Sequence, residues 1–94
     1  MKEVLIDRKA DIALKTLPQS DRSRAIRFIR LLEDRPWKDF FLTPRVKKIA
    51  GQENLYIVRI TKDLRLILQV QDDAAKVLDI VRHDRITKFF KSST

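Results

Sequence analysis

Two arginines, Arg59 and Arg65, stand at positions that could hold an anion such as a phosphate. They belong to two segments, Leu55–Ile60 and Leu64–Val70, in which apolar and polar residues alternate with the period of two that is typical of strands. The apolar residues of both segments can face one core only if an odd number of residues separates them, which predicts the hairpin loop Thr61-Lys62-Asp63. Arg59 then lies directly opposite Arg65 on the other face of the sheet.

Two like charges placed opposite one another cost stability, so an anion between them would relieve a repulsion that the fold does not require. The same alternation in Lys76–Arg82 takes Leu78 and Ile80 as the core residues of a further strand. The residues it places on the arginine face are Val77, Asp79 and Val81. Asp79 could neutralise one of the arginines, so an anion site and a surface ion-pair network remain equal alternatives.

His83, the only histidine, joins this face if the last strand extends by one residue. A basic sheet surface suits metal-free work on RNA, in which a base deprotonates the ribose 2′-OH and cations stabilise the charge that builds on the phosphate. Other chemistries lack their residues. Gly51 is the only glycine, so no glycine-rich loop can cradle a nucleotide, and the absence of cysteine excludes disulfides and thiolate zinc sites. We expect neither a metal nor another cofactor.

The composition describes a small, folded and basic protein. With 94 residues, the chain has room for one domain, 1–94, and its 44% hydrophobic content is that of a globular protein. The net charge of +8 points to a phosphate-rich or acidic partner. No run of 18 apolar residues and no signal peptide is present, which predicts no membrane association and fits a cytoplasmic location.

Two helices are expected between a short first strand and the later strands. Met1–Asp7 alternates like a short strand, and the apolar spacing then changes to that of a helix from Arg8 until Pro18. A second helix should run from Ser20 or Asp21 to about Asp34. Its exposed side carries three arginines at helical spacing, which we interpret as solvated: Arg24, Arg27 and Arg30.

The rest of the chain predicts a connector followed by antiparallel strands. Arg35–Pro44 should be a connector whose aromatic residues close the edge of the core: Trp37, Phe40 and Phe41. Strand patterns then cover Arg45–Ile49, Leu55–Thr61, Leu64–Val70 and Lys76–Arg82, and a turn or short helix covers Asp84–Lys91. The short breaks make consecutive strands antiparallel neighbours. We therefore predict an α+β fold, an N-terminal helical hairpin packed on a small twisted antiparallel β-sheet.

The order and spacing of several strings resemble the RelE/ParE superfamily of toxins from bacterial type II toxin–antitoxin systems. The strings are Lys48-Ile49-Ala50-Gly51, Tyr56-Ile57-Val58-Arg59-Ile60, Asp63-Leu64-Arg65-Leu66-Ile67 and the pair His83-Asp84, which is similar to a variant branch of the superfamily. The resemblance covers nearly the whole chain. It implies a microbial RNase-like fold and a ribosome-dependent mRNA endonuclease that needs no metal.

The same resemblance implies roles for particular residues. Arg59 and Arg65 would hold the scissile phosphate, and His83 would act as base toward the 2′-OH or protonate the leaving 5′-oxygen. Residues that would follow the RNA are Lys47, Lys48, Arg82, Arg85 and Phe90. Two positions depart from the RelE pattern, because Ile57 replaces a lysine and Phe89 or Phe90 replaces a tyrosine.

The implied partners are a cognate antitoxin in a hetero-oligomer and mRNA in the ribosomal A site. A ParE-like inhibitor of DNA gyrase shares the fold and needs no nuclease, so it stands as the alternative. A toxin fold whose activity has decayed to binding alone is a third possibility.

Overall fold

The chain begins with a short strand, as the alternation along Met1–Asp7 predicts, so the helical hairpin follows a strand and does not stand at the N-terminus, where the predicted fold class places it. The computed structural model describes residues 1–41 and 43–85. Its strands are β1 (Glu3–Ile6), β2 (Val46–Lys48), β3 (Leu55–Arg59), β4 (Leu64–Gln71) and β5 (Ala74–Arg82). Its helices are α1 (Arg8–Thr16), α2 (Gln19–Asp34), α3 (Lys38–Phe41) and the 3-10 turn η1 (His83–Arg85). The two long helices therefore follow β1.

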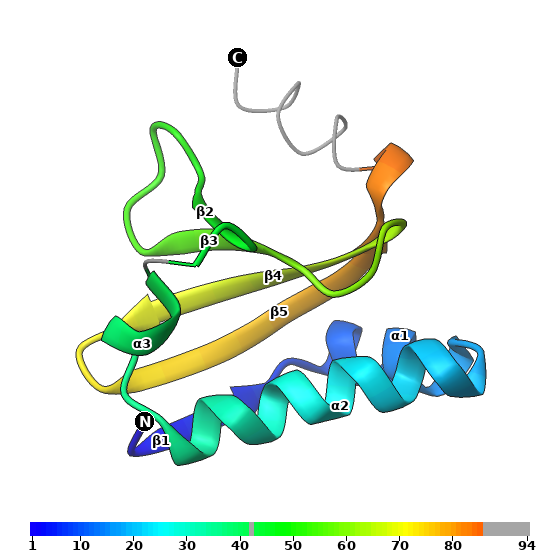
Figure 1. Cartoon of the computed structure of the whole chain (residues 1–94), viewed down its shortest axis with the longest axis horizontal. Coiled ribbons are helices and arrows are strands. Elements are labelled where there is room, and N and C mark those ends of the chain that lie inside the picture. Colours follow the sequence, from blue (N-terminus) through cyan, green and yellow to red (C-terminus); the bar gives the residue numbers. More distant parts are fainter. Residues whose placement is uncertain (42, 86–94) are drawn as a thin grey trace.

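The sheet is mixed, which corrects the prediction of an antiparallel one. Its strand order is β1-β5-β4-β3-β2, and β1 runs parallel to β5 while every other pair is antiparallel. Alternation along Met1–Asp7 indicates a strand but carries no information about its partner or direction. β1 forms one edge of the sheet and the short β2 forms the other (Figure 1).

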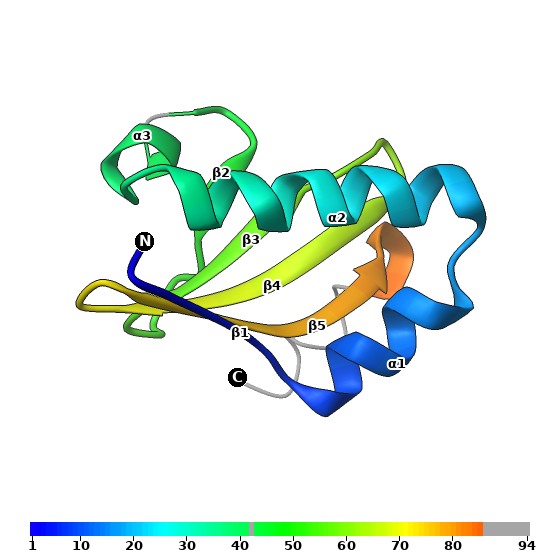
Figure 2. The same ribbon diagram turned by 90° about the horizontal axis from the view of Figure 1, so that it is seen from below.

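Both long helices cover one face of the sheet, as the sequence predicts. α2 lies along this face, and α1 packs mainly against β5 (Figures 1 and 2). Ala25, Ile29 and Leu32 recur at helical spacing and are buried because they form the core-facing stripe of α2. Arg22 Nη2 donates to the carbonyl oxygen of Leu17 at 3.0 Å, which ties the start of α2 to the end of α1.

The connector contains one short helix, α3, where the sequence predicts no regular element. Its aromatic residues close the edge of the core as expected. Phe40 is buried, and its ring stacks on that of Trp37 with the ring centroids 6.0 Å apart. The Trp37 ring in turn meets the Tyr56 ring edge-on, with the centroids 4.9 Å apart. The side chain of Phe41 lies outside the described part of the chain.

The β3–β4 hairpin has the register that alternation predicts. Arg59 pairs with Arg65, and the Ile60 N–H donates to the Leu64 carbonyl oxygen at 3.0 Å across the loop Thr61-Lys62-Asp63. The predicted core residues of both strands are buried: Tyr56, Val58, Ile60, Leu64, Leu66, Leu68 and Val70.

A β-bulge in β5 makes one prediction wrong. Ile67 pairs with Asp79 and Leu68 pairs with Val77, so Leu78 has no partner on β4. Val77 is consequently fully buried in the core, whereas Leu78, the predicted core residue, is only half-buried. Beyond the bulge the prediction holds, because Ile80 is buried in the core.

Candidate phosphate-binding site

A basic pocket of about 300 Å³ lies over the ends of β3 and β4. Three of the predicted site residues for catalysis line it together, namely Arg59, Arg65 and His83. The remaining lining residues are Pro44, Arg45, Lys47 and Ile57. None of the seven lining residues carries a carboxylate, so an anion entering the pocket meets positive charge and hydrogen-bond donors.

Strand register places these side chains on the sheet face opposite the helices. Arg59 pairs with Arg65, and Lys47 pairs with Ile57, two residues before Arg59 on the same face. The Arg59 N–H donates to the Arg45 carbonyl oxygen at 2.9 Å, which continues the pairing beyond β2 and brings Arg45 beside Arg59.

Arg65 is held from one side by the hairpin loop. Its Nη1 donates to the carbonyl oxygens of Thr61 at 2.7 Å, Leu64 at 3.1 Å and Lys62 at 3.2 Å. Its Nε and Nη2 make no hydrogen bond to any described residue. The loop therefore fixes the guanidinium while leaving two nitrogens to bind an anion.

His83 reaches the pocket because strand pairing continues one step past β5. Its N–H donates to the Asp63 carbonyl oxygen at 2.7 Å, adjacent to the Leu64–Arg82 pair. The side chain is exposed and lines the pocket with both arginines. The His83 imidazole, which can transfer a proton, therefore lies beside two arginines that can bind an anion.

Asp79 forms its ion pair with α1. Its carboxylate lies 3.2 Å from Lys9 Nζ and accepts the Ile80 N–H at 2.8 Å. No ion pair joins Asp79 to Arg59 or Arg65 in the described ranges. Of the two alternatives that the sequence leaves open, this geometry favours the anion site.

The other predicted RNA-contacting residues lie elsewhere. Lys48 lines a separate hollow beside Gly51 at the β2–β3 turn. Arg82 and Arg85 line a cavity of about 540 Å³ between α1 and the end of β5. Arg82 pairs with Leu64 and so points to the helix-covered face, away from Arg65. Phe90 lies outside the described residues.

Arg45 is the site residue that sequence reasoning missed. It stands two residues before Lys47, so alternation from Lys47 would have placed it on the same face. Arg45 lies outside β2, but it lines the pocket and its carbonyl oxygen accepts from the Arg59 N–H, so it belongs to the site.

Two further features are absent from the described ranges, 1–41 and 43–85. They contain no group of three or more side chains that could hold a metal ion. No helix among them has the length and apolar character needed to cross a membrane.

Comparison with solved structures identifies the family. The chain is 30% identical to a chain of the archaeal RelE–RelB complex from Pyrococcus horikoshii, with 88% of this chain and 96% of that chain covered and a TM-score of 0.68. This chain belongs to the RelE toxin family. The resemblance that the sequence strings carry is therefore confirmed.

Two more distant RelE structures share the fold. The RelB–RelE antitoxin–toxin complex from Methanococcus jannaschii matches at 22% identity over 92% of this chain and 98% of that chain, with a TM-score of 0.75. The toxin–antitoxin complex RelBE2 from Mycobacterium tuberculosis matches at 18% identity over 86% and 96%, with a TM-score of 0.64. No protein-family model matches the sequence. A search among curated proteins finds no matching relative.

Proposed function

We propose that this RelE-family chain is the toxin of a type II toxin–antitoxin system and cleaves mRNA on the ribosome. The observation that carries the proposal is the pocket in which Arg59, Arg65 and the only histidine meet without a carboxylate. Such a pocket suits phosphoryl transfer, because positive charge stabilises the phosphate while a neighbouring imidazole moves a proton.

In the proposed reaction the 2′-oxygen of a ribose attacks the adjacent phosphorus. His83 takes the 2′-OH proton as the O2′–P bond forms, and the P–O5′ bond then breaks. The leaving 5′-oxygen receives a proton from the imidazolium or from water, which gives a 2′,3′-cyclic phosphate and a 5′-OH. Arg59 and Arg65 hold the non-bridging oxygens, on which negative charge increases in the transition state.

Because Ile57 cannot exchange a proton, more of the proposed proton transfer falls to His83. The resemblance places a lysine at this position in other RelE toxins, and here the apolar side chain lines the pocket. The pocket then holds Lys47 and His83 as the groups other than arginine that could exchange a proton. We assign the proton transfer to His83, since imidazole ordinarily changes its charge near neutral pH.

A cognate antitoxin completes the proposal. The similar chains come from complexes of RelE with RelB, and an acidic segment would be attracted to a toxin with a net charge of +8. The expected assembly is a toxin–antitoxin hetero-oligomer in the cytoplasm.

The test is cleavage of mRNA during translation with purified ribosomes. Wild-type protein should cut the translated message, whereas Arg65→Ala and His83→Ala should lower the cleavage rate by about a hundredfold or more. Arg30→Ala is the matched control. Arg30 is exposed on α2 and lies away from the pocket, so this substitution removes the same charge without changing the site. An intact message with wild-type protein, or full activity of both site variants, would refute the nuclease proposal.

A ParE-like inhibitor of DNA gyrase is the second candidate, and the apolar Ile57 in the pocket is the observation that favours it. A supercoiling assay separates the two candidates. Inhibition of gyrase together with intact mRNA would select this alternative. Induced expression without growth arrest would instead indicate a toxin fold retaining only binding.

A further inference from the structure

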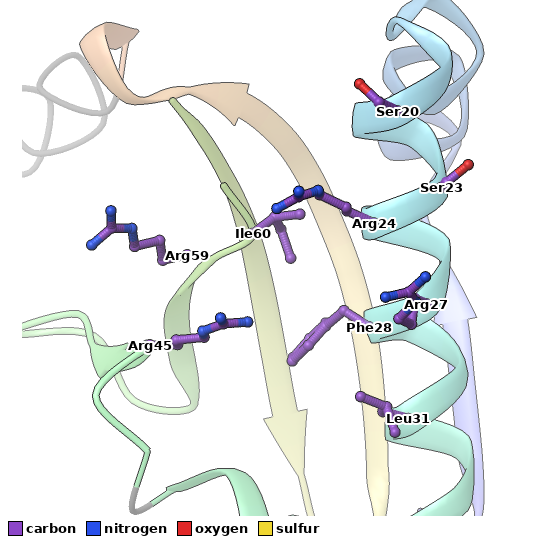
Figure 3. A pocket seen from close by; sticks show the side chains of 9 residues that line it. All are labelled: Ser20, Ser23, Arg24, Arg27, Phe28, Leu31, Arg45, Arg59 and Ile60. Carbon is purple, nitrogen blue, oxygen red and sulfur yellow. The ribbon is translucent and has the colours of Figure 1, made fainter. Parts of the chain in front are cut away.

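A second basic hollow, here named the arginine groove, lies between α2 and the edge of the sheet. It has a volume of about 460 Å³. Its cationic lining consists of Arg24, Arg27, Arg45 and Arg59, and its other lining residues are Ser20, Ser23, Phe28, Leu31 and Ile60. Figure 3 shows Arg24 extending from α2 and Arg45 from the sheet side toward one another, with Phe28 and Ile60 between the two walls.

Among the residues that the structure describes, the four arginines of the groove have no acidic partner. None of them forms an ion pair within the described part of the chain, and no lining residue carries a carboxylate. Arg24, Arg27, Arg45 and Arg59 are all exposed, so their guanidinium groups are accessible to an external anion. Like charges gathered around one hollow repel each other, and a bound polyanion would remove that repulsion.

The arginine groove is continuous with the candidate phosphate-binding site. Arg45 and Arg59 line both hollows, and a third hollow joins them along Arg24, Pro44, Arg45, Arg59 and Lys62. Basic residues therefore follow an uninterrupted path from α2, past Arg45 and Arg59 at the end of β3, to His83. The cations on this path are Arg24, Arg27, Arg45, Lys47, Arg59, Lys62 and Arg65.

The floor of the groove is apolar and partly fixed. The half-buried Phe28 packs edge-on against Phe40, with ring centroids 5.6 Å apart, and Ile60 beside it is buried. Ser20 and Ser23 of α2 also line the groove, and in Figure 3 the Ser20 hydroxyl lies toward the sheet side while the Ser23 hydroxyl points away from it. An apolar floor between guanidinium groups suits a nucleotide chain, because bases and riboses contact the floor while phosphates accept hydrogen bonds from the walls.

We propose that the arginine groove binds the sugar-phosphate backbone of the RNA strand next to the phosphate that reacts, with Arg24 and Arg27 as its α2 contacts. The proposal rests on the proposed function for the identity of the strand. It gives a role to two helix arginines that the sequence alone assigns to a solvated face. The shared Arg45 and Arg59 favour RNA over an acidic peptide, because a strand held at the pocket enters the groove without interruption.

The test measures binding of uncleavable 2′-O-methyl RNA. The probes are a dinucleotide, which fits the pocket alone, and a single strand of about twelve nucleotides, which can also fill the groove. The variant is Arg24→Gln with Arg27→Gln. The matched control is Arg8→Gln with Arg30→Gln, which removes the same charge from exposed positions that line neither hollow.

The α2 variant should bind the longer strand about tenfold more weakly and lower the slope of log affinity against log salt by about 1.4, the value for two lost contacts to a single strand. Its dinucleotide affinity should equal that of the control. Equal affinity and slope of both variants for the longer strand would overturn the proposal. So would an equal loss of affinity for poly-L-glutamate, since it would assign the groove to acidic polypeptides.

The binding measurement does not depend on catalysis. If the wild-type protein fails to cut mRNA but the α2 variant still loses affinity as expected, the nuclease proposal fails and the groove stands. If mRNA is cut and the two variants bind RNA alike, the groove assignment alone fails.

Discussion

At the scale of single residues, Arg59 and Arg65 form a pair that favours anion binding but lowers the stability of the free protein. They are cross-strand partners, and Arg65 is further fixed by three backbone carbonyl oxygens that accept from its Nη1, two in the loop and one at the start of β4. An arginine with one nitrogen bonded to the loop and others unbonded differs from a solvated surface cation, which keeps rotational freedom. The pair is therefore preorganised for an anion, and it costs stability when no anion is bound.

Replacing one of these arginines should separate the two effects. Arg59→Gln removes the repulsion and should raise the free energy of unfolding by a few tenths of a kcal/mol, on the order of 0.2–0.5, while greatly reducing RNA cleavage. Urea unfolding and the translation assay provide the two measurements. Arg30→Gln is the control, because it removes an exposed charge that lines none of the basic hollows and should leave stability unchanged. A clear loss of stability in Arg59→Gln would contradict this account.

At the scale of elements, α2 both anchors the core and forms a wall of the arginine groove. Leu32 is fully buried in the core, whereas its neighbour Leu31 is 36% exposed and lines the groove. The same helix thus presents one face to the sheet and another to a ligand.

Adjacent leucines on α2 allow a matched comparison. Leu32→Ala should lower the free energy of unfolding by about 3 kcal/mol, because it leaves a cavity in the core, and Leu31→Ala should lower it by less than about 1 kcal/mol. Denaturant unfolding monitored by circular dichroism measures both values. Equal losses would mean that α2 is not seated on the sheet as described.

How much of the fold the sequence predicts also depends on the element. Alternation predicts the β3–β4 hairpin and the face of Arg59 and Arg65, because a buried face fixes the register of both strands. The same reasoning fails at Leu78, since an extra residue in a bulge shifts the alternation without a local signal. The parallel pairing of β1 with β5 escapes prediction as well, because it joins the two ends of the described chain.

At the scale of the whole molecule, seven cations line one continuous surface. The net charge of +8 predicts only that a polyanion is a suitable partner. Folding brings cations from α2, the β2 side and the β3–β4 hairpin onto a single path around the sheet edge. Of the cations on this path, alternation predicts Arg59 and Arg65 and the family resemblance adds Lys47, whereas the contribution of α2 depends on how the helix packs.

Small anions should consequently stabilise the folded protein. Sulfate should bind the native pocket and relieve its repulsion, and it should therefore raise the melting temperature more than sodium chloride of the same ionic strength does. The double variant Arg59→Gln with Arg65→Gln should lose most of this difference, leaving the general salting effect of sulfate. Arg8→Gln with Arg30→Gln should retain it. Thermal unfolding by calorimetry gives these comparisons, and an equal response of the two double variants would contradict a pocket-specific effect.

The three-residue connection between β3 and β4 restricts which insertions and deletions the chain can accept. Adding or removing one residue there would turn the apolar set of one strand toward solvent and move Arg59 and Arg65 to opposite faces. A change of two residues preserves both the core and the pair. Active variants of this chain should therefore differ in loop length by an even number of residues, whatever residues fill the loop.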